Sequence, residues 1–311
     1  ITSVNKLPAS GSPREYYRIS GTGTTVIGAI NLDREENEAF ISFSKHFRSK
    51  GLAVPEIYLV DLENNAYLQE DLGDMTLFDF QFKIRNNGAF PVELMQVYKK
   101  VLTELQKFQI TGGQGLDYSA CYPRSSFDRQ SMQWDLSYFK YYFLKLAGIP
   151  FNEQDLENDY NTLIEYLLAQ DTNYFLYRDF QSKNVMLRDG EPCFIDYQGG
   201  RKGALQYDVA SLLYDSKADL PPEVREELLE HYIDGLVNYP SVDPQRFRDS
   251  YYSYVLIRIM QAMGAYGFRG FYEKKTHFLQ SIPYALNDLK WILENVNFSI
   301  EIPTLLEVYK H

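Results

Sequence analysis

Three oxygen-bearing side chains follow one another at short spacing near the middle of the chain. Asn184 comes five residues after Asp179, and Asp196 comes twelve residues after Asn184. Residues 184–195 read as two short apolar strands, and Arg188-Asp189-Gly190-Glu191 is typical of the turn between them. The pattern predicts a hairpin whose two ends bring polar groups to a common point.

Phosphoryl transfer is a chemistry that needs this set of groups. It requires alignment and neutralisation of phosphate charge more than covalent participation by the protein. Asp179 fits the carboxylate that orients a hydroxyl and accepts its proton, whereas Asn184 and Asp196 fit the oxygen ligands that Mg²⁺ prefers. Lys183 is a candidate for stabilising transition-state charge, or else a solvated surface lysine. Taken singly, each acidic or amide residue could instead serve only a turn or a cap, but the joint pattern favours the kinase chemistry.

The elements that must hold these residues divide the chain into two parts. The first seventy residues predict strands at 15–19, 24–30, 56–62 and 66–70, with one helix at 34–50. The remainder predicts amphipathic helices at 94–109, 130–147, 153–170, 222–237, 248–266 and 282–296. We therefore expect an α+β fold with a small sheet lobe over residues 1–70 and a large helical lobe over residues 71–311.

Composition narrows the classes of partner. The formal charge is −11, which disfavours a nucleic-acid backbone as partner. No run of eighteen apolar residues predicts a membrane span, and two cysteines make a disulfide framework improbable. Four scattered histidines offer no zinc spacing. We expect a cytoplasmic protein with a small-molecule substrate, and the start at Ile1 leaves open a further domain beyond this sequence.

Arg178-Asp179 with Asn184, followed by Ile195-Asp196-Tyr197-Gln198, resembles the catalytic and metal segments of the aminoglycoside phosphotransferase family, within the protein-kinase-like fold. The resemblance extends to residues 54–56, 70–74 and 207–213. Within that family the chain looks most similar to sugar kinases that phosphorylate the anomeric hydroxyl of N-acetylmuramate and N-acetylglucosamine in cell-wall recycling. The features that carry this narrower likeness are Leu7-Pro8, Trp134 and residues 257–269.

The resemblance implies a two-lobed protein-kinase-like fold with an antiparallel N-lobe sheet, and ATP and Mg²⁺ as cofactors. The loop with Ser10, Gly11 and Ser12, together with Arg14, is a candidate phosphate-binding segment or an ordinary tight turn. The connection at residues 70–73 would offer backbone groups, at Glu70 and Leu72, to an adenine edge. The side chain of Asp74 is expected to cap the next helix.

Substrate contacts are expected from the helical lobe. The candidates are Asp135, Arg258 and Gln261, for each of which a helix-packing role is an equal alternative.

Two departures from the family pattern stand out. Tyr177 replaces the histidine that usually opens the catalytic loop, at a position that serves packing and hydrogen bonding. No lysine occurs in Val26-Ile27-Gly28-Ala29-Ile30, where kinase-like folds place the phosphate-binding lysine that pairs with a helix glutamate. The possible helix acids are Glu35, Glu36 and Glu38, and the possible replacement cations are Arg14 and Lys45.

We therefore expect an ATP-dependent small-molecule kinase that phosphorylates a hydroxyl, in the first place that of an amino sugar. Two alternatives stay open. One is a nucleotide-binding regulatory module with little or no turnover, a pseudokinase, for which the missing lysine argues. The other is a kinase for an aminoglycoside, a choline-like alcohol or homoserine, because the acidic charge fits a cationic acceptor as well as a neutral sugar.

Overall fold

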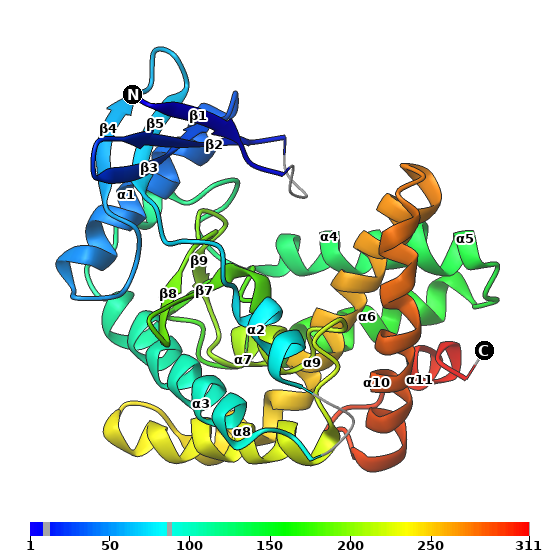
Figure 1. Cartoon of the computed structure of the whole chain (residues 1–311). Coiled ribbons are helices and arrows are strands. Elements are labelled where there is room, and N and C mark those ends of the chain that lie inside the picture. Colours follow the sequence, from blue (N-terminus) through cyan, green and yellow to red (C-terminus); the bar gives the residue numbers. More distant parts are fainter. Residues whose placement is uncertain (9–12, 86–88, 311) are drawn as a thin grey trace. The chain divides into compact units, whose positions relative to one another are not determined.

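The structure is a computed structural model that describes residues 1–8, 13–85 and 89–310 (Figure 1). The chain packs into two compact units. The first comprises Ile1–Ser125 and Tyr177–Arg201, and the second comprises Ser126–Leu176 and Lys202–His311. The hairpin with the candidate catalytic residues thus belongs to the same unit as the N-terminal sheet. The functional division after residue 70 remains a prediction, since these units are defined by packing alone.

An antiparallel sheet of five strands forms the N-terminal part of the first unit (Figure 1, blue). Its strand order is β1-β2-β3-β5-β4, with bounds β1 Ser3–Lys6, β2 Glu15–Gly21, β3 Thr24–Ile30, β4 Ile57–Asp61 and β5 Ala66–Glu70. The four strands predicted from the sequence are all present. β1 was not predicted, because all four of its residues are exposed and it carries no apolar alternation.

Helix α1, Arg34–Ser49, lies against one face of this sheet. Asp33 caps its first turn by accepting a hydrogen bond from the backbone N–H of Glu36 at 3.1 Å. On its buried side Phe40 stacks on Tyr67 of β5, with ring centroids 5.4 Å apart. The apolar side of α1 therefore fixes which face of the sheet is covered.

Two helices and a hairpin complete the first unit: α2 Leu77–Ile84, α3 Val92–Gln106, β7 Val185–Arg188 and β8 Glu191–Phe194. Between β7 and β8 stand only Asp189 and Gly190, with φ of 54° and 80°. Positive φ at both central residues is the geometry of a type I′ turn, which matches the twist of a hairpin. The turn predicted from the sequence is confirmed.

The start of α2 corrects one expectation. Its capping residue is Thr76, whose Oγ1 accepts from the backbone N–H of Asp79 at 3.0 Å. Asp74 is instead 80% exposed at its side chain and pairs with Arg18, 2.8 Å between the charged atoms. The prediction that Asp74 caps this helix was wrong, because an ion pair across the sheet competes for its carboxylate.

The second unit is mainly helical. Its helices are α4 Arg129–Phe139, α5 Lys145–Ala147, α6 Glu153–Leu168, α7 Gln206–Leu213, α8 Pro222–Gly235, α9 Pro244–Gly267, α10 Ile282–Asn295 and α11 Pro303–Val308. Two short strands, β6 Tyr174–Leu176 and β9 Arg201–Gly203, pair beside them. No helix within the described residues is long and apolar enough to cross a membrane. A small antiparallel sheet followed by a helical remainder confirms the predicted α+β class.

Helix α9 closely approaches α4 and the π-helical segment that follows it, η3 Lys140–Leu144, at two glycines. A Cβ at Gly264 would lie 2.8 Å from the backbone nitrogen of Phe139 in α4, and one at Gly267 would lie 1.9 Å from the backbone oxygen of Tyr142 in η3. Both contacts are with backbone, which cannot rotate away as a side chain can. The packing of α9 against α4 and η3 therefore depends on the absence of side chains at both glycines.

Replacing Gly267 by Ala is expected to lower the free energy of unfolding by about 1–3 kcal/mol, the usual range for overpacking. Helix propensity alone predicts the opposite sign, since Ala is favoured over Gly by about 1 kcal/mol inside a helix. Urea unfolding measures the difference. Gly21→Ala is the control, because the nearest atom to its added Cβ is 3.9 Å away. A stabilised Gly267→Ala protein would contradict the close helix contact.

Candidate active site

The β7–β8 hairpin brings Asn184 and Asp196 together. Asn184 directly precedes β7 and Asp196 lies two residues after β8, so the antiparallel pairing joins the two ends. The backbone N–H of Ile195 donates to the carbonyl of Asn184 at 3.1 Å. The side-chain Nδ2 of Asn184 then donates to Oδ2 of Asp196 at 3.1 Å.

Asp179 is held to this hairpin through its backbone. Its carbonyl accepts from Nδ2 of Asn184 at 2.8 Å and from the backbone N–H of Gln181 at 2.9 Å. In the part of the chain that the structure describes, no hydrogen bond or ion pair engages its half-buried carboxylate. The carboxylate is therefore positioned by its loop and is available to accept a proton.

Tyr177 supports the same loop from the protein interior. Its ring is fully buried between aromatic neighbours, among them Phe108 and Tyr197 in edge-on contact, and its hydroxyl donates to the carbonyl of Ile195 at 2.5 Å. This bond fixes the residue immediately before Asp196. A tyrosine here performs the packing and hydrogen bonding that the sequence suggested for the position.

Two residues of the site have an unfavourable backbone conformation. Arg178 and Asp196 have φ of 80° and 69°, a region that residues with a Cβ seldom occupy. Each such residue costs on the order of 1–3 kcal/mol and persists only where the surrounding structure holds it. One of the two residues, Arg178, directly precedes Asp179. The other is Asp196 itself, whose backbone conformation determines the direction of its carboxylate.

Negative charge accumulates around Asp196. Burial, and then the neighbouring Asp179, raise its pKa above the usual value, while a hydrogen bond from Gln198 and the charge of Arg14 lower it. Nε2 of Gln198 donates to Oδ1 of Asp196 at 2.7 Å. The balance is unfavourable to the charged carboxylate, so a cation bound beside it would relieve the excess charge.

The donor set fits a hard divalent cation. Both hydrogen bonds of the Asn184 side chain use its nitrogen, which leaves the carbonyl oxygen Oδ1 for a metal beside the Asp196 carboxylate. Among the described residues no group of three or more His, Cys, Asp or Glu could hold a metal by itself. A cation that takes one or two protein oxygens and completes its shell with phosphate and water matches this arrangement.

The predicted nucleotide residues fall in three places. Ser10, Gly11 and Ser12 lie outside the described residues. Glu70 ends β5 and its carboxylate pairs with Arg188, whereas Leu72 packs beside Met186. Within the described part of the chain the backbone N–H and carbonyl of Leu72 form no hydrogen bond, so both are available to a ligand.

The candidate cations differ in burial and in the groups they contact. Arg14 is buried and pairs with Glu36 of α1, 2.9 Å between NH2 and Oε2, whereas Lys45 lies on the exposed side of α1. Lys183 is exposed, and its Nζ stands 4.8 Å from the centroid of the Phe78 ring. The proposed transition-state role of Lys183 would need its flexible side chain to leave this ring.

The predicted substrate residues lie in the second unit. Asp135 is buried on α4, and Arg258 is buried on α9, the helix that packs against α4. Arg258 donates from Nε to Oγ of Ser211 and from NH1 to Oε1 of Gln261, both at 2.9 Å. The structure thus joins Arg258 and Gln261 in one polar group.

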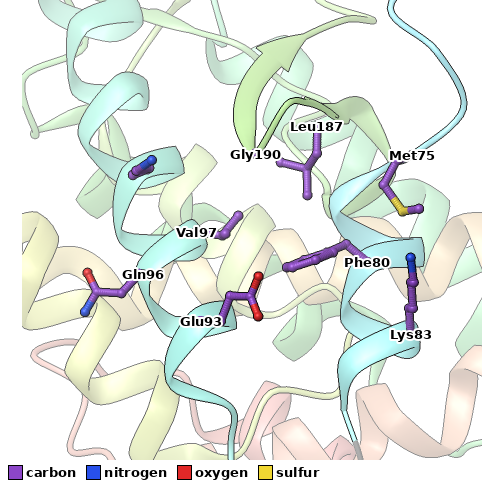
Figure 2. A pocket seen from close by; sticks show the side chains of 9 residues that line it. Met75, Phe80, Lys83, Glu93, Gln96, Val97, Leu187 and Gly190 are labelled. Atoms are coloured by element: carbon purple, nitrogen blue, oxygen red, sulfur yellow. The ribbon is translucent and has the colours of Figure 1, made fainter.

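A pocket of about 610 Å³ lies on another side of the hairpin, between α2 and α3 (Figure 2). Phe80 of α2 points across it toward Val97 of α3, and Leu187 and Gly190 of the hairpin cover it. None of the predicted site residues lines this pocket. It is therefore separate from the group around Asp179.

Two contributors were not predicted. Gln198 donates a hydrogen bond to Asp196, and the only feature of the sequence that could have indicated this is that Gln198 follows Asp196 by two residues. Arg18 of β2 binds Asp71 in the connection after β5, 2.7 Å between Nε and Oδ2. Arg18 and Asp71 are 53 positions apart in the sequence, so no local pattern could have linked them.

The sequence profile of the phosphotransferase enzyme family matches residues 3–244. This chain belongs to that family. An N-acetylmuramate/N-acetylglucosamine kinase of Neisseria meningitidis is 26% identical over 287 residues, which cover 89% of this chain and 81% of the relative. A protein of the same name in Pseudomonas aeruginosa is 26% identical over 240 residues, covering 75% and 66%. The family and these relatives confirm the predicted resemblance, and the protein is a phosphotransferase of the small-molecule kinase class.

Solved structures agree on the fold. The amicoumacin kinase hAmiN, determined in complex with AMP-PNP, Ca²⁺ and Ami, has a TM-score of 0.63 at 13% identity and covers 96% of this chain and 90% of its own. The Plasmodium vivax ethanolamine kinase has a TM-score of 0.65 at 12% identity, covering 92% and 81%. At such identities the likeness concerns the fold alone, which is the protein-kinase-like fold predicted from the sequence.

Replacing Asp196 by Asn is expected to stabilise the metal-free protein at neutral pH. The raised native pKa means that the charged carboxylate disfavours the folded state. The contribution of the Asp196 carboxyl is therefore full below its unfolded pKa of about 3.9 and is lost as pH rises through the native pKa. Urea unfolding in EDTA should show the advantage of the variant growing as the pH rises above about 4.

Asp61→Asn is the matched control with the opposite sign. Hydrogen bonds from Asn64 lower the pKa of Asp61, so its charged form favours folding and the substitution removes that benefit as pH rises. An Asp196→Asn difference that does not change with pH would contradict the electrostatic account.

Proposed function

We propose that this protein is an ATP- and Mg²⁺-dependent kinase that transfers the γ-phosphoryl group to a hydroxyl of an N-acetylated amino sugar. The observation that carries the proposal is the hairpin that joins Asn184 to Asp196 with the Asp179 carboxylate on the adjoining loop. The acceptor class is supported by the names of the Neisseria and Pseudomonas relatives.

Asp179 acts as the base in this proposal. It orients the acceptor hydroxyl and takes its proton while the hydroxyl oxygen forms a bond to the γ-phosphorus and the bond to the β-phosphate oxygen breaks, releasing ADP. Oδ1 of Asn184 and the Asp196 carboxylate would hold Mg²⁺, which when bound neutralises phosphate charge. Lys183 stands next to Asn184 and would add positive charge near the transferred group.

Backbone groups bind the nucleotide base and its phosphates in this proposal. The N–H and carbonyl of Leu72, two residues after Glu70 at the end of β5, suit the hydrogen-bonding edge of adenine. Ser10, Gly11 and Ser12 would approach the phosphates through their backbone, because small residues allow close contact.

The acceptor would contact the polar group in the second unit. Arg258 offers a guanidinium that suits the carboxylate of N-acetylmuramate, and Gln261 offers an amide for hydroxyl or acetamide groups. Asp135, on the neighbouring helix α4, would accept hydrogen bonds from sugar hydroxyls.

Replacing Asp179 by Asn is expected to lower kcat about 10²- to 10⁴-fold, the usual contribution of a general base, with little change in nucleotide affinity. ADP release is measured with ATP, Mg²⁺ and N-acetylmuramate or N-acetylglucosamine. The control is Asp189→Asn, the same substitution at an exposed turn residue with φ of 54°, a conformation that Asn accepts.

The same assay separates the competing functions. Turnover of an aminoglycoside, choline or homoserine, but of neither amino sugar, would retain the kinase and overturn the acceptor. Stabilisation by nucleotide without turnover of any acceptor would instead favour the regulatory module.

Gln261→Ala is expected to raise the KM for the amino sugar severalfold, on the order of the 0.5–1.5 kcal/mol of one hydrogen bond. The KM for ATP should not change. Gln245→Ala is the matched control, because Gln245 lies on the same helix α9 but is exposed and bonded to Asp249. If Gln261→Ala and Gln245→Ala change the KM for the amino sugar equally, Gln261 does not contact the acceptor.

A further inference from the structure

Ala29 of β3 stands at a strand position that faces α1. The register pairs Ala29 with Tyr16 in β2 and with Tyr67 in β5, so the three side chains share one face of the sheet. Tyr67 stacks on Phe40 of α1, which identifies this face as the one covered by the helix. Ala29 is 1% exposed, so the face is packed there and carries no cation from the strand itself.

The Arg14 guanidinium lies beside this same group of side chains. Arg14 precedes β2, is 3% exposed, and its NH1 donates to the hydroxyl of Tyr16 at 3.3 Å. Its guanidinium carbon lies 5.9 Å from the centroid of the Phe40 ring. A cation from the residue directly before β2 thus lies on the α1-facing side of the sheet, where Ala29 carries no charge.

Glu36 of α1 is the acidic partner. Its Oε2 lies 2.9 Å from NH2 of Arg14 and also accepts from Nδ2 of Asn31 at 2.6 Å. Glu35 is exposed, and Glu38 pairs on the surface with Arg34 of the same helix. Of the three helix acids considered from the sequence, Glu36 is therefore the one that meets a buried cation.

The pair also lies near the hairpin site by packing. The Phe40 ring that the Arg14 guanidinium approaches stacks on Tyr197, with ring centroids 5.0 Å apart. Tyr197 directly follows Asp196 in the chain, so one aromatic stack separates the Arg14–Glu36 pair from the residue next to the Asp196 carboxylate. A buried ion pair is a poor source of stability, because the loss of hydration offsets the attraction. Its presence here calls for a reason other than stability.

We propose that Arg14, held by Glu36, replaces the missing strand lysine and binds the α- and β-phosphates of the nucleotide. This inference rests on the proposed ATP-dependent function. A guanidinium presents five N–H donors in a planar fork, so it can engage a phosphate while one edge stays on a carboxylate. In this proposal the cation comes from the residue before β2 in place of β3, and the helix glutamate orients it.

Arg14→Ala is expected to weaken binding of AMP-PNP with Mg²⁺ roughly ten- to a hundredfold, the equivalent of one charge-assisted contact. Adenosine, which has no phosphates, should bind within about twofold of wild type, because its affinity does not include that contact. Calorimetric titration of both ligands gives the ratio of the two affinities. The matched control is Arg34→Ala, which removes an exposed arginine of α1 paired with Glu38.

Two further variants sharpen the test. Glu36→Gln keeps the size of the partner but removes its charge, and should weaken AMP-PNP selectively and by less than Arg14→Ala. Arg14→Ala combined with Ala29→Lys moves the cation to β3 and should recover part of the lost AMP-PNP affinity. If Arg14→Ala does not fold, the ratio of the AMP-PNP and adenosine affinities is measured for Glu36→Gln and Arg14→Lys instead, and a selective loss of AMP-PNP affinity supports the inference.

The outcomes are distinct. Equal losses for adenosine and AMP-PNP would assign Arg14 a structural role and overturn the inference, as would unchanged AMP-PNP affinity in Arg14→Ala. A wild-type protein that binds AMP-PNP but phosphorylates no acceptor would defeat the proposed function while leaving this inference standing. Failure of the wild type to bind AMP-PNP at all would overturn both.

Discussion

The pairing of β7 with β8 is the constraint on which the candidate site depends. A two-residue turn at Asp189 and Gly190 sets the register, and that register brings Asn184 opposite the residues after β8. A shift of one residue would turn every side chain of the hairpin to the other face. Asn184 could then no longer bond both the Asp179 backbone and the Asp196 carboxylate.

The site is a region of unfavourable charge and backbone geometry held by its surroundings. Asp179 and Asp196 repel each other, and Asp196 also adopts a left-handed backbone conformation. The opposing interactions come from the fully buried Tyr177 ring, the Gln198 amide and the charge of Arg14. The proposed binding of a cation beside Asp196 would offset this unfavourable charge, because a positive ion stabilises the charged form of a buried carboxylate.

Agreement between sequence and structure is best where the signal is local. The hairpin turn, the strands at residues 15–30 and the first helix could be predicted, because turn residues and apolar spacing reflect local geometry. β1 could not, since an exposed edge strand has no apolar pattern. The cap of α2 was misassigned because Arg18, from a distant strand, binds Asp74 and leaves Thr76 as the cap. Nor did the sequence predict the π-helical segments η1 Lys107–Gly112, η3 Lys140–Leu144 and η6 Phe268–Tyr272, because apolar spacing does not distinguish a single π-turn from α-helix.

The sequence by itself determined which residues are candidates for the chemistry: Asp179, Asn184 and Asp196 at their spacing, and the absence of a lysine in the third strand. Those facts depend only on residue type and order. Tertiary structure decided which cation pairs with which helix acid. Arg14 and Glu36 are 22 positions apart, and they meet only because α1 packs on the face of the sheet beside the start of β2. From the sequence, Arg14 and Lys45 were both possible replacements for the missing strand lysine. The structure distinguishes them, because Arg14 is buried and Lys45 is exposed.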